Sequence, residues 1–150
     1  VPYGSSNLAK SGCGPTSFAM IASTLTGKTI TPADAIAWCG NSYYISGSGT
    51  SWSYFAAAAS HFGLGVTVNQ TSSINDVITA LKQGKYVISS QAPGLFTSGG
   101  HFIVLSGIDS SGNITVKDPN KNNAVTKGYN NRTFTSSEIN QAAKGYWIFN

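Results

Sequence analysis

The feature that most restricts the fold of this chain is a change of hydrophobic period near Tyr86. Before this residue, apolar side chains recur three and four positions apart, as in Phe18–Leu25 and Ile74–Leu81, which is typical of amphipathic helices. After it, short runs rich in Val, Ile and Phe are separated by turn residues, which is typical of strands. Helices followed by antiparallel strands predict an α+β fold, and 150 residues suit one domain, residues 1–150.

Local start and stop signals give the expected elements. Helices are predicted at about 14–26, 31–40, 50–63, 73–84 and 136–143, and several of them begin at a capping residue or end at a glycine. Strands are predicted at 66–68, 86–90, 102–108, 114–117 and 146–149, with a hairpin turn over 110–113 and loops over 1–12 and 41–49. In the third helix, one apolar stripe is predicted to hold Trp52, Phe55, Ala56 and Ala59.

Charge restricts the partners. Nine Lys and Arg stand against five Asp and Glu, a net charge of +4, and only 9% of residues are charged. The basic residues are scattered, with no arginine-rich run and no interleaving of basic and aromatic residues, so we expect no nucleic-acid partner, whereas weak attraction to an anionic bacterial wall fits. No stretch is long enough for a membrane span. The start at Val1 without a signal-like segment suggests a domain excised from a larger protein. We expect the domain to be a monomer.

Cys13 stands in the motif Ser11-Gly12-Cys13-Gly14-Pro15-Thr16-Ser17. Because proline fits the first position of a helix, we expect the thiol at a helix N-terminus, where backbone amides and the helix dipole stabilise an anion. Cys13 is therefore a candidate nucleophile. Two alternatives stay open: a buried cysteine that acts as a small hydrophobe, or a disulfide with Cys39 that would block the thiol. Cys39 itself is expected to be a buried free thiol.

A nucleophilic thiol needs a base, and a third group must orient that base. His101 follows two glycines and opens a predicted strand, whereas His61 is expected on the surface of its helix. The hairpin brings Asp118 back beside His101, so Asp118 is the acid best placed to accept the imidazole N–H. Asp109 lies at the hairpin end and is predicted to form the turn. Asp118 could also be only a turn residue before Pro119.

Four blocks of the chain resemble the signature blocks of the C39-like cysteine peptidases, papain-like enzymes of Gram-positive bacteria and their phages. They stand in family order and are Gly12–Ser17, Gly47–Trp52, Gly100–Leu105 and Gly112–Asn120. The resemblance implies the papain-like form of the α+β class. In that fold, N-terminal helices, one with the nucleophile at its N-terminus, pack on a C-terminal antiparallel sheet.

The resemblance also implies roles for single residues. Cys13 would be the nucleophile, His101 the general base and acid, and Asp118 the residue that orients His101. Papain-like enzymes usually place a glutamine six residues before the nucleophile as an oxyanion donor, and here that position holds Asn7, which is shorter by one methylene. Asn7, Ser6 or the backbone N–H of Cys13 would bind the oxyanion, and losing one such donor typically lowers the rate by about 10²–10³.

Two loops, 47–52 and 91–99, would flank the substrate cleft of such an enzyme. Trp52, Tyr44, Gly49 and Gly100 are the candidates for contact with the substrate, although for Trp52 core packing on its own helix is the slightly favoured alternative. No residues show metal-ligand spacing and no glycine-rich loop carries the lysine of a phosphate site, so we expect no metal and no cofactor.

These observations lead to a thiol hydrolase that cleaves amide bonds through an acyl-enzyme. The expected substrate is peptidoglycan, with the protein acting outside the cell at the bacterial wall as a secreted hydrolase or phage lysin. A protease that processes proteins or peptides and a transglutaminase-like acyl transferase are alternative enzymes. An inactive wall-binding module is the alternative that is not an enzyme.

Overall fold

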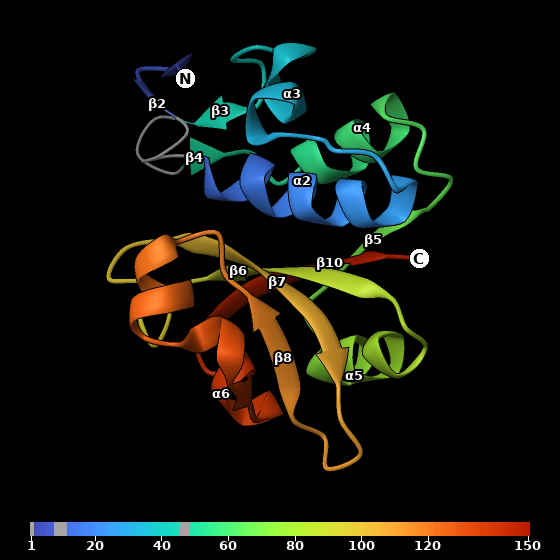
Figure 1. Ribbon diagram of the computed structural model, residues 1–150, viewed down its shortest axis with the longest axis vertical. Coiled ribbons are helices and arrows are strands. Elements are labelled where there is room, and N and C mark those ends of the chain that lie inside the picture. The colour runs from blue at the N-terminus through green and yellow to red at the C-terminus, as the bar shows by residue number, and fades with distance from the viewer. Residues whose placement is uncertain (1, 8–11, 46–48) are drawn as a thin grey trace. The chain divides into compact units, whose positions relative to one another are not determined.

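The computed structural model describes residues 2–7, 12–45 and 49–150, and it divides into two compact units, Val1–Thr67 and Val68–Asn150 (Figure 1). Ser11, Gly47 and Ser48, which belong to the sequence motifs above, lie outside the described residues. Each unit is described by itself below. The interpretation of residues 1–150 as a single domain stays a prediction.

The first unit is built from helices and two very short hairpins. Its helices are α2 (Cys13–Thr26), α3 (Pro32–Ala37) and α4 (Tyr54–His61). Its hairpins pair β1 (Pro2–Tyr3) with β2 (Ser6–Asn7) and β3 (Tyr44–Ile45) with β4 (Gly49–Thr50). The sequence predicted loops for both hairpins. Two-residue strands carry no period of their own, and they form here because each finds a partner strand.

Local signals explain where the predicted helices begin and end. Thr31 and Asp34 form a reciprocal capping box at the start of α3, and Gly27 ends α2 in the left-handed conformation that glycine adopts readily. Tyr54 is fully buried between these helices, where its hydroxyl donates to the Ala35 carbonyl at 2.6 Å and its ring packs edge-on against Phe18. Burial raises the pKa of Tyr54 far above its ordinary value.

The second unit is a six-stranded antiparallel sheet in the order β5-β10-β6-β7-β8-β9. The strands are β5 (Val68–Thr71), β6 (Tyr86–Gln91), β7 (His101–Ile108), β8 (Ile114–Lys117), β9 (Thr133–Phe134) and β10 (Ala143–Phe149). Helix α5 (Ile74–Lys82) packs on β6, β7 and β10 (Figure 1). Its Val77 and Leu81 join Val87, Leu105 and Tyr146 of the sheet in one buried core. Helix α6 (Ser136–Asn140), the π-helix η1 (Asn122–Thr126) and the short 3₁₀ helix η2 (Tyr129–Asn131) complete the unit.

The hairpin of β7 and β8 brings the chain back toward His101, as the sequence predicted. Ile108 pairs with Ile114 next to the turn, and Val104 pairs with Lys117 at the far end, with one irregularity between Leu105 and Gly107. At the turn, Asp109 Oδ1 accepts the N–H groups of Ser111 and Asn113, both at 2.9 Å, which confirms Asp109 as a turn-former. The strand end at Lys117 delivers Asp118 to the region where β7 begins.

Several predicted boundaries were wrong. Helix α4 begins at Tyr54, so Trp52 precedes it and is 41% exposed, and Ala56 is exposed too. The predicted Trp52 stripe is therefore wrong: the buried face of α4 is instead formed by Tyr54, Phe55, Ala58 and Ala59. Strand β5 lies at 68–71 because it pairs with β10, and α6 ends at Asn140 because β10 already begins at Ala143.

Three further predictions concerned His61, Cys13 and Cys39 of the first unit. His61 is exposed as predicted, and its ring stacks on Trp38 at 4.5 Å between ring centroids. Cys13 and Cys39 are both free thiols, so no disulfide joins them. Cys39 is half-buried rather than buried, its Sγ lies 3.6 Å from the Ile36 carbonyl, and burial raises the pKa of its thiol.

Candidate active site

Cys13 is the first residue of α2, at the N-terminal end of a 14-residue helix. No side chain caps this end, and the first helical hydrogen bond runs from the Thr16 N–H to the Gly12 carbonyl at 2.8 Å. Pro15 is the third helical residue and not the first, as the sequence had suggested. Proline costs no hydrogen bond there, because the first four N–H groups of a helix have no partner within it. The half-buried thiol thus lies where a helix favours an anion.

The residue after Cys13 must be small because Thr50 approaches it closely. A Cβ added at Gly14 would lie 2.9 Å from both Cβ and Oγ1 of Thr50. The same Thr50 hydroxyl hydrogen-bonds the buried Tyr3 hydroxyl at 2.8 Å. Burial raises the pKa of Tyr3, so Tyr3 stays a neutral hydrogen-bonding group. These contacts fix β1 and β4 against the start of α2.

The other predicted site residues of the first unit lie on or next to its hairpins. Asn7 ends β2 and pairs with Pro2. Tyr44 lies on β3, packs its ring edge-on against Tyr3 at 5.0 Å, and hydrogen-bonds Ser5 through its hydroxyl at 3.0 Å. Gly49 begins β4. Trp52 follows β4 by two residues, and its exposure argues against core packing.

His101 and Asp118 lie in the second unit, and the structure brings them together as the hairpin predicted. His101 is the first residue of β7, directly after the exposed Gly100, and its Nε2 lies 2.6 Å from Asp118 Oδ1. The two side chains are 4% and 0% exposed. An imidazole and a carboxylate in such contact form a charge-assisted hydrogen bond, which is among the stronger ones in proteins.

Three asparagines surround Asp118, and the sequence analysis gave none of them a role. The Asn120 N–H donates to Asp118 Oδ1 at 2.8 Å, and Asn123 Nδ2 donates to Asp118 Oδ2 at 3.0 Å. The backbone N–H of Asp118 donates to Asn130 Oδ1 at 2.9 Å. The only feature of the sequence that could have indicated these hydrogen bonds is the density of asparagine after Asp118, in Asp118-Pro119-Asn120-Lys121-Asn122-Asn123. The buried carboxylate is therefore hydrogen-bonded at both oxygens, as buried polar groups require.

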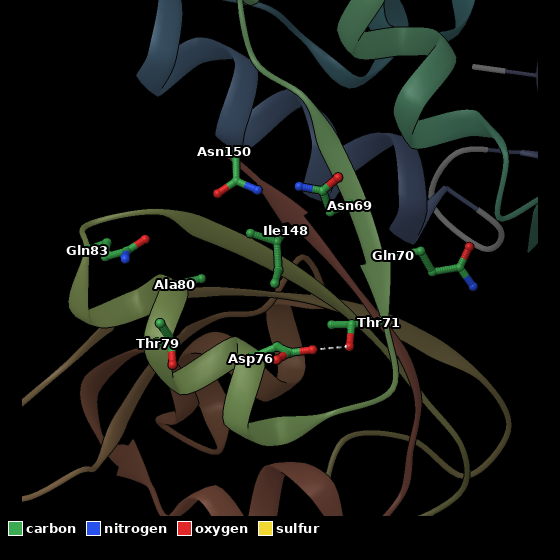
Figure 2. Close-up of a pocket in the computed structure, with 9 residues that line it drawn as sticks. All are labelled: Asn69, Gln70, Thr71, Asp76, Thr79, Ala80, Gln83, Ile148 and Asn150. Carbon is green, nitrogen blue, oxygen red and sulfur yellow. Dashed lines mark hydrogen bonds between the residues drawn. The ribbon is translucent and has the colours of Figure 1, made fainter.

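A separate groove of about 360 Å³ lies on the second unit between β5, α5 and the end of β10. Its lining is mostly amides and hydroxyls, and Figure 2 shows Thr71 donating to Asp76 beneath it. The lining residues are Asn69, Gln70, Thr71, Asp76, Thr79, Ala80, Gln83, Ile148 and Asn150. None of the predicted site residues is among them.

Two further properties apply only to the part of the chain that the structure describes. Within it, no three His, Cys, Asp or Glu side chains gather in a way that could hold a metal ion. Within the same ranges, no helix has the length and apolar character needed to cross a membrane.

Comparison with known proteins identifies the fold. The sequence model of the Peptidase_C39 like family matches residues 1–146. A protein from Bacillus anthracis described as a C39-like peptidase is 19% identical, over 93% of this chain and 88% of that chain, with a TM-score of 0.66. The peptidase domain of Streptococcus ComA, a bifunctional ABC transporter involved in a quorum-sensing pathway, is 17% identical, over 93% and 90%, with a TM-score of 0.65. No curated protein matches the chain. The predicted fold class is confirmed.

Proposed function

Since the chain belongs to the Peptidase_C39 like family and is a cysteine peptidase, we propose that Cys13, His101 and Asp118 perform its chemistry. The observation that carries this proposal is the buried hydrogen bond between His101 Nε2 and Asp118 Oδ1, at 2.6 Å. A histidine held in this way by a carboxylate has one fixed ring orientation and one fixed tautomer, which general base catalysis requires. Cys13 at the start of α2 is the nucleophile that such a base would serve.

The proposed reaction follows from this arrangement. Because Nε2 of His101 donates to Asp118, Nδ1 is the nitrogen that takes the proton of the Cys13 thiol. The thiolate attacks the substrate carbonyl, and the resulting oxyanion accepts the backbone N–H of Cys13 and the side-chain amide of Asn7. His101 returns the proton to the departing amine, which leaves a thioester. Water, deprotonated by His101, then cleaves the thioester, releases the acid product and restores the thiol.

For the substrate, we propose the peptides of a bacterial cell wall, cleaved outside the cell by a monomer. The positive net charge of +4 favours approach to an anionic wall, and Tyr44, Gly49, Trp52 and Gly100 would contact the substrate. Cleavage of a secreted peptide is the second candidate. It is favoured by the structural likeness to the ComA peptidase domain, which belongs to a transporter in a quorum-sensing pathway.

Alkylation and digestion together test the catalytic proposal. At pH 6, iodoacetamide should label Cys13, because the proposed base His101 takes the proton of its thiol, whereas Cys39 should stay unlabelled because burial raises the pKa of its thiol. Loss of labelling in Cys13→Ala, but not in the control Cys39→Ala, is the expected result. Cys13→Ala should also abolish cleavage of purified peptidoglycan, with the released fragments identified by mass spectrometry.

Two results would reject parts of this proposal. Full activity in Cys13→Ala would remove Cys13 as the nucleophile. If Cys13 labels normally but only free peptides are cleaved, the peptide-processing candidate replaces the wall hydrolase.

A further inference from the structure

We propose that Asn123 is a positioning residue of the active site: its side-chain amide holds the Asp118 carboxylate and the segment before His101 in the geometry that the base needs. This inference rests on the proposed function, because it assigns Asn123 a role through His101 and Asp118. It adds a residue that lies outside the four signature blocks of the sequence analysis.

The side-chain amide of Asn123 makes two buried hydrogen bonds. Asn123 is 3% exposed on the π-helix η1, and its Nδ2 lies 2.7 Å from the Phe96 carbonyl and 3.0 Å from Asp118 Oδ2. Both partners are acceptors, so the NH₂ group and not the amide oxygen must face them, and both of its hydrogens are used. Alanine lacks these donors, and aspartate would place a second acceptor against both partners.

The hydrogen bond from Asn123 to Asp118 fixes the rotation of the Asp118 carboxylate. The terminal torsion of an aspartate is broad, so the torsion itself does not decide which way Oδ1 points. In this structure, Oδ1 meets His101 while Oδ2 meets Asn123, so the carboxylate plane is held from both sides. Without Asn123, the plane could rotate and the bond to Nε2 would lose its alignment.

The hydrogen bond from Asn123 to the Phe96 carbonyl holds the segment that precedes His101. Phe96 belongs to the segment between β6 and β7, which leads directly into His101. Its ring is buried against Phe134 at 5.0 Å, and its carbonyl receives Asn123. One amide therefore ties together the segment that delivers the base and the residue that orients the base.

Asn123 is itself held in place, as a positioning residue must be. Its backbone N–H donates to Asn120 Oδ1 at 3.1 Å, and the Asn120 N–H donates in turn to Asp118 Oδ1. Residues 118–123 thus close around the carboxylate. The π-helical turn that carries Asn123 is a rare conformation, and such turns occur frequently at functional sites.

The neighbour Asn122 offers a matched control: it is the same residue type on the same helix, but it is exposed. For Asn123→Ala, kcat normalised to the fraction of Cys13 that iodoacetamide labels should fall about tenfold or more, with KM little changed. Asn122→Ala should leave both kcat and KM unchanged. Asn123→Asp keeps the shape of the side chain and should lower kcat at least as much, so it serves if the alanine variant folds poorly. The NMR signal of the His101 Nε2 proton should move in both Asn123 variants and stay in place in Asn122→Ala.

The possible failures are distinguishable. A loss of labelled Cys13 and of thermal stability with unchanged kcat per labelled site would show that Asn123 is only structural, and it would overturn the inference. An unmoved His101 signal in both Asn123 variants would do the same. If instead Cys13→Ala retains full activity, the proposed function fails before Asn123 is considered.

Discussion

Replacing Asp118 with asparagine tests whether the carboxylate is needed as an acceptor on both of its oxygens. Three donors face it: His101 Nε2 and the Asn120 N–H at Oδ1, and Asn123 Nδ2 at Oδ2. An asparagine at this position has one oxygen and one NH₂ group. If its oxygen faces His101, its NH₂ group meets the NH₂ of Asn123. If it is turned round, its NH₂ group meets the Asn120 N–H and forces His101 into the other tautomer.

The cost can be worked out from these contacts. Either orientation leaves a buried donor facing another donor, which costs about 1–3 kcal/mol. Hydrogen bonds to a charged group contribute about 1 kcal/mol more than neutral ones, and that advantage is lost as well. We expect Asp118→Asn to lower the free energy of unfolding by about 3 kcal/mol, which corresponds to a fall in Tm of roughly 6–12 °C for a chain of this size. Activity should fall by about 10² or more, because the charge that supports His101 is lost in both orientations, and in the turned one the base is in the wrong tautomer to accept the thiol proton.

Asp109→Asn is the matched control for stability. Asp109 Oδ1 alone accepts both N–H groups at its turn, so the amide oxygen of an asparagine can replace it without a clash. Urea unfolding of the two variants should separate them by about 2 kcal/mol or more. If Asp118→Asn is no less stable than Asp109→Asn, and if it keeps wild-type activity, the reasoning about two required acceptors is refuted.

Two further predictions follow, one for each unit. Gly14→Ala should destabilise the protein by about 1–3 kcal/mol in urea unfolding, because its Cβ would lie 2.9 Å from Thr50. The control Gly99→Ala should change stability little, because a Cβ there meets nothing within 4 Å. Equal effects of the two substitutions would exclude the close approach of Thr50 as the reason for glycine at position 14. Burial raises the pKa of Tyr146 from 10.0 to about 12, so the folded state retains a proton there that the unfolded state loses, and stability should fall as pH rises from 10 through 12. Tyr146→Phe should make that fall shallower, and an unchanged slope would show that Tyr146 does not contribute.

The sequence predicted the elements that have a period of their own. Helix α5 was located from Ile74, Val77 and Leu81, and β8 was predicted with its observed bounds. The pairing of His101 with Asp118 was also predictable, because a short turn at Ser111 fixes which residues of the two strands return side by side.

What the sequence missed depends on contacts between distant residues. The strands holding Tyr3 and Thr50 are two residues long, and their side chains hydrogen-bond across 47 positions of sequence. Trp52 looked like part of a helical stripe, but α4 begins only after it. Asn123 was missed because its partner Phe96 lies 27 positions away, and because a π-helical turn has no simple residue signature.

Neutral groups, and not cations, hold the carboxylate of Asp118. Among the described residues, the donors to its oxygens besides His101 are the backbone N–H of Asn120 and the side-chain amide of Asn123, while Asn130 Oδ1 accepts the backbone N–H of Asp118. An arginine or lysine in place of Asn123 would also donate to the carboxylate, but its charge would neutralise it. Neutral donors stabilise the buried anion while leaving its charge to act on one neighbour, the imidazole, which in the proposed mechanism becomes positive when it takes the thiol proton. The neutral donors of the segment after Asp118 therefore suit the proposed role of this carboxylate, which is to support a catalytic histidine.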